Sequence, residues 1–317
     1  MLKKNEAIAQ LNQLGSDNQP FSFYCDFLGE NWCISRDAIN DDFVLKIRDQ
    51  PSSRVKVAPK FEKSPASFSS FKKSFDSVVN EINIGNSFLT NLTFQTPITT
   101  DLSIEQIFNC SEAKYRLLVP DKFVVFSPET FVKIKDGFIH SYPMKGTIDA
   151  KIPNAKEQLL GDVKEKAEHV TIVDLIRNDL SQVAQEVTVT KFRYIDSIKT
   201  NQKELLQVSS EIKGKLDPSW KNQIGSILSK LLPAGSISGA PKPETLRIIR
   251  DNESYNRGFY TGICGHFDGN KLDTGVMIRF IKIVEEQLFY CSGGGITSFS
   301  SPQKEYQEMV DKIYLPF

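Results

Sequence analysis

The sequence predicts an α+β fold with largely antiparallel strands. Of its 317 residues, 40% are apolar and 25% are charged, which is typical of a globular protein that can build a sizeable core. Strand patterns occur as hairpin-like pairs, and helical patterns come in separate runs instead of regular alternation. No repeat with a period of 20–50 residues is present. The length alone suits either two domains or one large unit.

The N-terminal part predicts strands, a linker and then a helix. Phe21–Phe27 and Phe43–Ile47 have the composition of strands. Residues 50–70 are rich in Pro, Ser and Lys, and they are the best linker candidate. From Phe71 to Ile84, apolar residues recur every three or four positions, which predicts a helix. Gly85 is placed to end it.

The middle of the chain predicts further strands followed by one long helix. Alternating or purely apolar segments are bounded by turn residues, which is typical of strands. A helical pattern then extends from about Ala155 to Val183. The predicted strands are Phe88–Phe94, Tyr115–Val119, Phe123–Phe126 and Phe131–Ile139.

The C-terminal part predicts helices, then strands, then a last helix. Helices are expected at Trp220–Leu231 and near Pro243–Arg250. The last helix begins at Ser301-Pro302, because Ser is a favoured N-cap and Pro is favoured in the first turn. The strands between them are expected at Gly258–Phe267, Leu272–Val284 and Gln287–Ser292.

Charge and cysteine content exclude several classes of partner. The 39 basic residues balance 39 acidic ones, so we expect neither nucleic acid nor a membrane as partner. No apolar run approaches the ~20 residues of a membrane span, and the N-terminus lacks the apolar stretch of a signal peptide. An odd number of widely spaced cysteines indicates reduced thiols in the cytoplasm. These are Cys25, Cys33, Cys110, Cys264 and Cys291.

Two helical segments each carry a pair of glutamates three residues apart. Glu165 and Glu168 form one pair, and Glu305 and Glu308 form the other. This spacing places both carboxylates on one helical face. If the two faces meet across a cleft, their oxygens suit a hard divalent cation such as Mg²⁺. Solvated helix faces are the alternative interpretation.

Two small-residue segments and one lysine are further candidates. In residues 232–242, backbone N–H groups before a helix can face an anion, and Gly293-Gly294-Gly295 permits close backbone approach. A structural turn is the alternative for each. Lys145 lies between an apolar stretch and Gly146-Thr147, where desolvation favours the neutral, nucleophilic amine. A simply solvated lysine is the alternative.

Six segments, taken in order, resemble the chorismate-utilising enzymes. This family includes the first components of anthranilate synthase and aminodeoxychorismate synthase, isochorismate synthases and salicylate synthases. The resemblance covers about residues 70 to 317. It is carried by residues 140–147, residues 165–179, residues 231–242, residues 257–262, residues 272–274 with Arg279, and residues 293–295 followed by Glu305 and Glu308.

The resemblance implies a four-layer α/β/β/α fold around a two-sheet, mainly antiparallel core. Residues 1–317 would then form a single chorismate-binding domain, with a shortened N-terminal portion of about residues 1–65 that contributes strands. It also implies that Mg²⁺ is held directly by Glu168 and Glu308, and mostly through water by Glu165 and Glu305. The substrate chorismate would be held by Tyr260, Arg279, Gly146, Thr147, Gly293, Gly294, Gly295 and Lys312.

Single positions distinguish the members of the family. Lys145 in the Pro-x-Lys-Gly-Thr segment resembles aminodeoxychorismate synthases, whereas anthranilate synthases usually carry Ala there. Leu89 aligns with the lysine that activates water in isochorismate synthases, and leucine cannot accept a proton. Glu129 matches the family's general acid. The resemblance thus implies that chorismate and ammonia give 4-amino-4-deoxychorismate, a folate precursor.

Ammonia would come from a separate glutamine amidotransferase, because no amidotransferase segment is recognisable in this chain. Two alternatives stay open. Anthranilate synthase component I is the alternative enzyme, and the residue at position 145 discriminates between the two. A catalytically inactive partner or regulatory subunit is the other. Retention of the four glutamates, Lys145, Glu129 and Arg279 argues against it.

Overall fold

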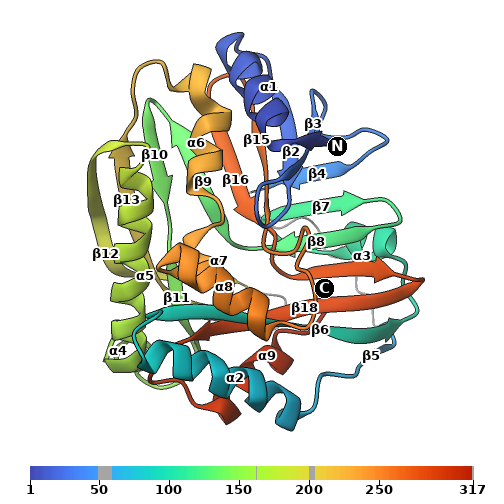
Figure 1. Cartoon of the computed structure of the whole chain (residues 1–317), viewed down its shortest axis with the longest axis vertical. Helices are drawn as coiled ribbons and strands as arrows, with labels where there is room; N and C mark the ends of the chain where they lie inside the picture. The colour runs from blue at the N-terminus through green and yellow to red at the C-terminus, as the bar shows by residue number, and fades with distance from the viewer. Residues whose placement is uncertain (49–58, 162, 200–203, 316–317) are drawn as a thin grey trace.

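The computed structural model describes residues 1–48, 59–161, 163–199 and 204–315. Strands in these ranges form two large antiparallel sheets with helices on their outer faces, which confirms the predicted α+β class (Figure 1). In the described part of the chain, no helix combines the length and the apolar character that crossing a membrane requires.

The first sheet contains ten of the described strands. Their order is β1-β3-β2-β15-β16-β9-β10-β13-β11, and β12 pairs with β13 beside this path. The bounds are β1 (Leu2–Lys3), β2 (Phe21–Cys25), β3 (Asn31–Ser35), β9 (Thr130–Lys135), β10 (Phe138–Ser141), β11 (Met144–Asp149), β12 (Gln185–Lys199), β13 (Glu204–Lys215), β15 (Ile263–Phe267) and β16 (Leu272–Val276).

The second sheet contains eight of the described strands. Their order is β14-β6-β18-β17-β8-β7-β4, and β5 pairs with β6. The N-terminal segment therefore contributes strands to both sheets. The bounds are β4 (Val44–Ile47), β5 (Phe61–Lys63), β6 (Leu89–Thr100), β7 (Tyr115–Val119), β8 (Phe123–Ser127), β14 (Gly239–Ala240), β17 (Phe280–Val284) and β18 (Gln287–Ile296).

Helices cover both outer faces. The ten-stranded sheet packs against α1 (Lys4–Ser16), α5 (Val163–Ser181) and α6 (Ile224–Leu231) with the preceding 3₁₀ turn η1 (Trp220–Gln223). The eight-stranded sheet packs against α2 (Phe68–Asn83), α3 (Ile104–Cys110) and α9 (Pro302–Asp311). The remaining described helices are α4 (Ala155–Gly161), α7 (Gly235–Ser238) and α8 (Lys242–Asn252).

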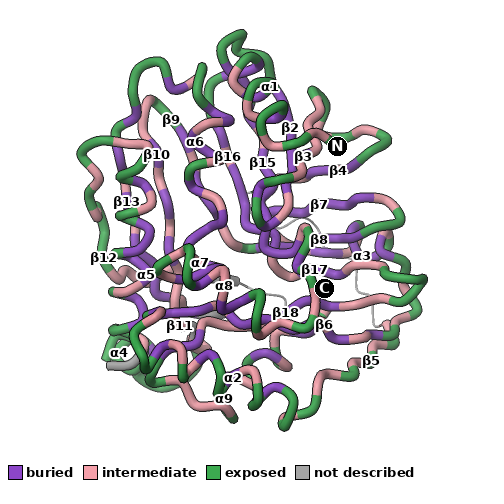
Figure 2. Tube along the Cα trace, in the orientation of Figure 1, coloured by how far each residue is buried: buried purple, intermediate pink, exposed green. Residues whose placement is uncertain are grey.

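A layer of apolar side chains fills the space between the sheets. Tyr24 and Cys264 from the first sheet meet Tyr115, Phe123 and Phe280 from the second in one buried cluster. The ring centroids of Phe123 and Phe280 lie 4.8 Å apart in a stacked arrangement. Figure 2 shows that the strands are largely buried, whereas exposed residues gather on helices and connecting loops. Burial of such rings is the main stabilising contribution to this kind of core.

Helix α2 confirms the periodicity from which it was predicted. Phe71, Phe75, Val78 and Ile82 are buried, and they pack on the eight-stranded sheet. The helix begins three residues before Phe71, because the Ser67 hydroxyl accepts a hydrogen bond from a backbone N–H in the first turn. The last helix, α9, also begins where it was predicted, although the Ser301 side chain makes no capping hydrogen bond.

One predicted strand proves to be a hairpin. Phe131–Ile139 is divided into β9 and β10, which pair with each other. Asp136 and Gly137 both have positive φ values, 53° and 77°, as a tight hairpin turn requires. The Asp-Gly pair is a strong hairpin signal, so the sequence contained the information that corrects this prediction.

A second predicted strand crosses from one sheet to the other. Leu272–Val284 consists of β16 in the first sheet and β17 in the second, interrupted by three residues that end at Arg279 with φ +53°. The predicted strand at 258–267 is also shorter, because residues 258–262 form a turn next to this crossing. There, Met277 N–H donates to the Gly262 carbonyl over 2.7 Å.

Other differences concern elements that periodicity did not show. Helix α1, strand β3, helix α3 and the long β12–β13 hairpin were not predicted. The predicted helix 155–183 is recorded as α4 and α5, and residue 162 between them lies outside the described residues. Of the expected linker, residues 50–58 also lie outside them, whereas β5 and the start of α2 occupy part of its second half.

Replacement of Gly225 by Ala will destabilise the fold, because α6 touches the backbone of α1 at this glycine. A β-carbon at position 225 would lie 2.6 Å from the Ile8 carbonyl oxygen and 2.8 Å from the Ile8 Cα. We expect the free energy of unfolding to fall by about 1–3 kcal/mol, as for other overpacked sites, measured by urea denaturation. Gly161→Ala is the control, since open space surrounds that helical glycine. Equal stability of the two variants would contradict this packing.

Candidate active site

A cavity of about 310 Å³ opens where the two sheets and α5, α7 and α9 meet. Most of the residues singled out from the sequence line it, although they come from distant parts of the chain. These are Glu129, Lys145, Gly146, Tyr260, Arg279, Gly293, Gly294, Gly295, Glu308 and Lys312. Glu165, Glu168 and Glu305 lie just behind this lining, and the Thr147 side chain is outside the described part of the chain.

Lys145 extends into the cavity from a bulge in β11. The bulge arises because the register with β13 shifts between Lys145 and Thr147, and Gly146 supplies the required positive φ of 72°. Lys145 Nζ donates to Glu168 Oε2 over 3.0 Å. Burial lowers the pKa of Lys145, but the nearby carboxylates, Glu168 foremost, outweigh it and the pKa is raised. Contrary to expectation, desolvation does not neutralise this lysine while Glu168 lies beside it.

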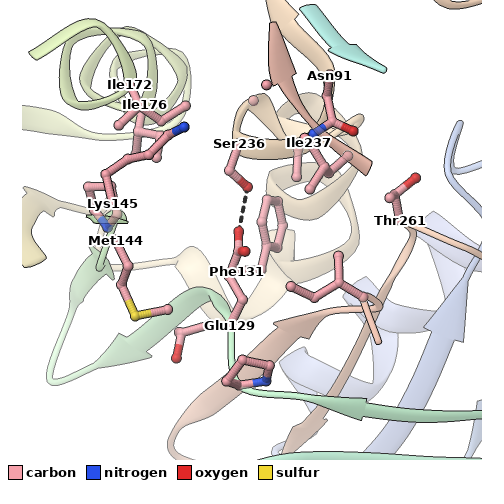
Figure 3. Close-up of a pocket in the computed structure, with 18 of the residues that line it drawn as sticks. Asn91, Glu129, Phe131, Met144, Lys145, Ile172, Ile176, Ser236, Ile237 and Thr261 are labelled. Atoms are coloured by element: carbon pink, nitrogen blue, oxygen red, sulfur yellow. Dashed lines mark hydrogen bonds between the residues drawn. The ribbon is translucent and has the colours of Figure 1, made fainter. Parts of the chain in front are cut away.

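Glu129 lies opposite Lys145, immediately before β9. Its Oε1 accepts a 2.6 Å hydrogen bond from Ser236 Oγ, drawn in Figure 3. Burial raises the pKa of Glu129, whereas the Ser236 hydroxyl and the charges of Lys312, Lys145 and Arg279 act against this rise. The net direction is upward, so this carboxyl keeps its proton to a higher pH than an ordinary glutamate.

Cationic and small residues form one end of the cavity. Arg279 Nη1 donates to the Lys312 carbonyl over 2.9 Å, and Lys312 Nζ donates to the Gly293 carbonyl over 2.8 Å. Next to them, the Ser292 hydroxyl is buried without a hydrogen-bond partner among the described residues, as is Arg279 Nε. Buried donors of this kind are normally satisfied, so their position points to a bound anionic or polar ligand.

The triple glycine lies within β18. The sequence had predicted that the strand ends before it, at Ser292. Gly293 pairs with Thr93 and Gly295 with Asn91 of the neighbouring strand β6. A β-carbon on Gly293 would collide with the backbone of that strand. At Gly294 a β-carbon would lie 3.7 Å from Lys312 Nζ. The missing side chains therefore keep this wall of the cavity thin and open to the charged groups.

The two glutamate pairs lie beside the cavity on two different helices, and of the four only Glu308 is part of the lining. On α5, Glu168 is buried beside Lys145, and Glu165 Oε2 would lie 3.3 Å from a β-carbon on Gly146. On α9, Glu305 is buried, and Glu308 pairs with Lys312 over 2.6 Å. Within the described residues, no three His, Cys, Asp or Glu side chains already lie together as a metal-binding group. The Mg²⁺ site stays a prediction.

In the segment 232–242, two of the backbone amides that were predicted to face an anion are already used within a helix. Residues 235–238 form the short helix α7, and the N–H groups of Ile237 and Ser238 already donate to the Ala234 carbonyl. These amides are therefore not free for an anion. The chemically useful group is the Ser236 hydroxyl, which sequence reasoning missed because it considered only the backbone of this segment.

Residues 12–316 match the family of chorismate binding enzymes, and the chain belongs to that family. An uncharacterized PabA-like protein of Haemophilus influenzae is 49% identical to it, over 98% of this chain and 96% of that protein. Aminodeoxychorismate synthase component 1 of Bacillus subtilis is 30% identical, over 79% of this chain and 55% of that protein.

Solved structures include a relative with the same architecture. Anthranilate synthase component I from Streptococcus pneumoniae superposes with a TM-score of 0.67 at 27% identity. The match covers 84% of this chain and 60% of that one. The chain thus spans between half and two thirds of the length of both synthases named here.

Ser236→Ala will raise the pKa of Glu129 further, because it removes the hydroxyl donor that favours the carboxylate form. We expect the whole titration curve of Glu129 to move to higher pH, because a hydrogen bond to a carboxylate favours its ionised form. The measurement is a ¹³C titration of the Glu129 carboxyl carbon, assigned by its absence in Glu129→Gln. Ser226→Ala, which removes a hydroxyl that bonds Asn12 on the α1–α6 contact, should leave the titration unchanged. An unchanged pKa in Ser236→Ala would contradict the hydrogen bond.

Proposed function

We propose that this protein is the first component of an aminodeoxychorismate synthase, which converts chorismate and ammonia to 4-amino-4-deoxychorismate. The observation that carries the proposal is the placement of Lys145 and Glu129 on one cavity. One is a nucleophilic side chain, and the other is a carboxyl with a raised pKa. Leu89, in place of a lysine, lines the same cavity, so no base at this position can activate water.

The charged end of the cavity suits a small dianion. Arg279 and Lys312 supply two positive charges, and Tyr260 and Ser292 add hydroxyl groups in the lining. We expect the enolpyruvyl carboxylate of chorismate at Arg279, Tyr260 and the Gly293–Gly295 backbone. Because the net charge of the chain is zero, this local charge and not the overall field would attract the substrate.

Mg²⁺ fits the remaining carboxylates. Glu165, Glu168, Glu305 and Glu308 offer only hard oxygen donors, and a lysine ammonium already occupies the cation position beside Glu168 and beside Glu308. We propose that Glu168 and Glu308 hold the ion directly and the other two hold it mostly through water. When bound, Mg²⁺ would neutralise and orient the ring carboxylate of chorismate.

The chain's own residues supply the proton transfer and the nucleophile. Glu129 would donate its proton to the departing C4 hydroxyl, which leaves as water. General acid catalysis of this kind typically increases the reaction rate about 10²–10⁴-fold. Lys145 would attack C2 as the free amine, so its ion pair with Glu168 must open first. Ammonia then forms a bond to C4 and the lysine leaves from C2, which restores Lys145.

Ammonia would come from a glutamine amidotransferase partner. The PabA-like name of the H. influenzae relative and the synthase name of the B. subtilis relative support this pairing. We propose that the complex works in the cytoplasm, in folate precursor synthesis. Anthranilate synthase component I is the second candidate, and the structural similarity to the S. pneumoniae enzyme favours it. Lys145, where that enzyme class usually has Ala, argues for the first.

Lys145→Ala will abolish formation of aminodeoxychorismate, because the proposed nucleophile is lost. The assay contains purified protein, chorismate, Mg²⁺ and ammonium, and identifies the product by mass and absorbance. We expect the rate to fall at least about 10²-fold.

Lys166→Ala is the matched control, since Lys166 is an exposed lysine on α5 two residues from Glu168. Anthranilate or isochorismate as the wild-type product would refute the proposed activity. Full activity in Lys145→Ala would refute only the lysine adduct and leave the activity itself standing.

A further inference from the structure

Arg257 and Glu253 form a buried ion pair behind the cavity wall. Their side chains are each 2% exposed, and two hydrogen bonds of 2.6 and 2.9 Å join them. Phe27 covers the guanidinium, whose central carbon is 4.6 Å from the ring centroid. Neither residue lines the cavity. Removing two charges from water costs free energy, and their mutual attraction often does not compensate for this cost. A buried ion pair is therefore weak evidence for stabilisation of the fold, and it can serve another role.

The other N–H groups of Arg257 bind three separate segments of the cavity wall. They donate to the Ile237 carbonyl over 2.8 Å, to Thr261 Oγ1 over 3.4 Å and to the Asn91 carbonyl over 2.7 Å. With the two bonds to Glu253, all five guanidinium N–H groups have acceptors. Asn91, Ile237 and Thr261 lie near one another on the side of the cavity away from Lys145 (Figure 3).

Glu253 fixes the same wall from the other side of the pair. Its Oε1 also accepts from the Thr93 N–H and the Thr93 hydroxyl, both over 2.8 Å. Asn91 and Thr93 are the residues of β6 that pair with Gly295 and Gly293. The ion pair therefore holds β6 beside the glycines of β18, at the end of the cavity that carries Arg279 and Lys312.

Helix α7 is one of the segments that this contact holds, beside the burial of Ile237 in the core and the pairing of β14 with β6. It has only four residues, too few to be stable by itself, and it carries both Ile237 and Ser236. The Ser236 hydroxyl reaches Glu129 only if this turn stays in place. Arg257 is the charged group that ties the Ile237 carbonyl of α7 to β6 and to the turn before β15.

We infer that Arg257, held by Glu253, is a positioning residue that sets the place of Ser236 Oγ against Glu129. The inference rests on the proposed role of Glu129 as general acid. Arg257 does not line the cavity and acts through the residues that it binds there, Ile237 of α7, Thr261 and Asn91 of β6. Lysine cannot replace it, because an ammonium lacks the planar fork that binds a carboxylate and two carbonyls together.

The test is Arg257→Lys, alone and combined with Ser236→Ala. The first readout is the ¹³C titration of Glu129, which needs no activity. Lys145 on β11, Arg279 between β16 and β17, and Lys312 at the end of α9 face this carboxyl and are present in every variant. We expect Arg257→Lys to raise the Glu129 pKa in the same direction as Ser236→Ala, and the double variant to shift it no further than Ser236→Ala.

The second readout is the kinetics with chorismate. We expect Arg257→Lys to lower kcat about tenfold or more while KM changes less, because a misplaced acid slows the reaction without weakening binding. Arg247→Lys is the matched control, since the partly exposed Arg247 pairs with Glu244 and Asp251 on α8 and with Glu81 on α2. It should match the wild type in both readouts.

Several outcomes would overturn the inference. One is an unchanged Glu129 titration in folded Arg257→Lys, and another is a double variant whose shift equals the sum of the single shifts. If circular dichroism shows that Arg257→Lys does not fold, Glu253→Gln replaces it. That variant should give a smaller shift in the same direction, and no shift would overturn the inference. A wild type that makes no aminodeoxychorismate refutes the proposed function, while the titration still decides the role of Arg257.

Discussion

The fold depends on one constraint: two large sheets share a single apolar layer, so the chain must pass from one sheet to the other. One of these crossings lies between Val276 and Phe280, where β16 ends in the first sheet and β17 begins in the second. A crossing strand cannot continue either ladder, so its residues turn away from regular pairing. Arg279, with its positive φ, lies at this break and lines the cavity. The site is thus located where the packing of the sheets is interrupted.

Charged residues are also concentrated at this cavity. A chain without net charge gathers Lys145, Arg279 and Lys312 at one cavity, and each interacts with a specific acceptor close by. Glu168 and Glu308 balance two of these cations. Paired in this way, buried charges avoid most of the penalty of isolated ones. The arrangement also explains why overall composition said nothing about an anionic ligand.

Sequence reasoning recovered the elements and residues whose signal is local. The periodicity at Phe71–Ile82 gave α2, and the ordered motifs led to most of the residues that line the cavity. Features that depend on contacts between distant segments could not be predicted from the sequence. Nothing in the pattern of residues 272–284 shows that the segment changes sheets. The role of Ser236 depends on a contact with Glu129 across 107 positions, and that of Arg257 on three segments at once.

The ion pair between Lys145 and Glu168 has a consequence for the protein at rest. A free amine in an open cavity reacts with aldehydes and carbon dioxide, whereas an ammonium does not, because it has no lone pair to offer. With its pKa raised beside Glu168, Lys145 stays in this inert form until the carboxylate is drawn away. The same contact that must open before Lys145 can act as the proposed nucleophile therefore also protects its amine from covalent damage while the ion pair is closed.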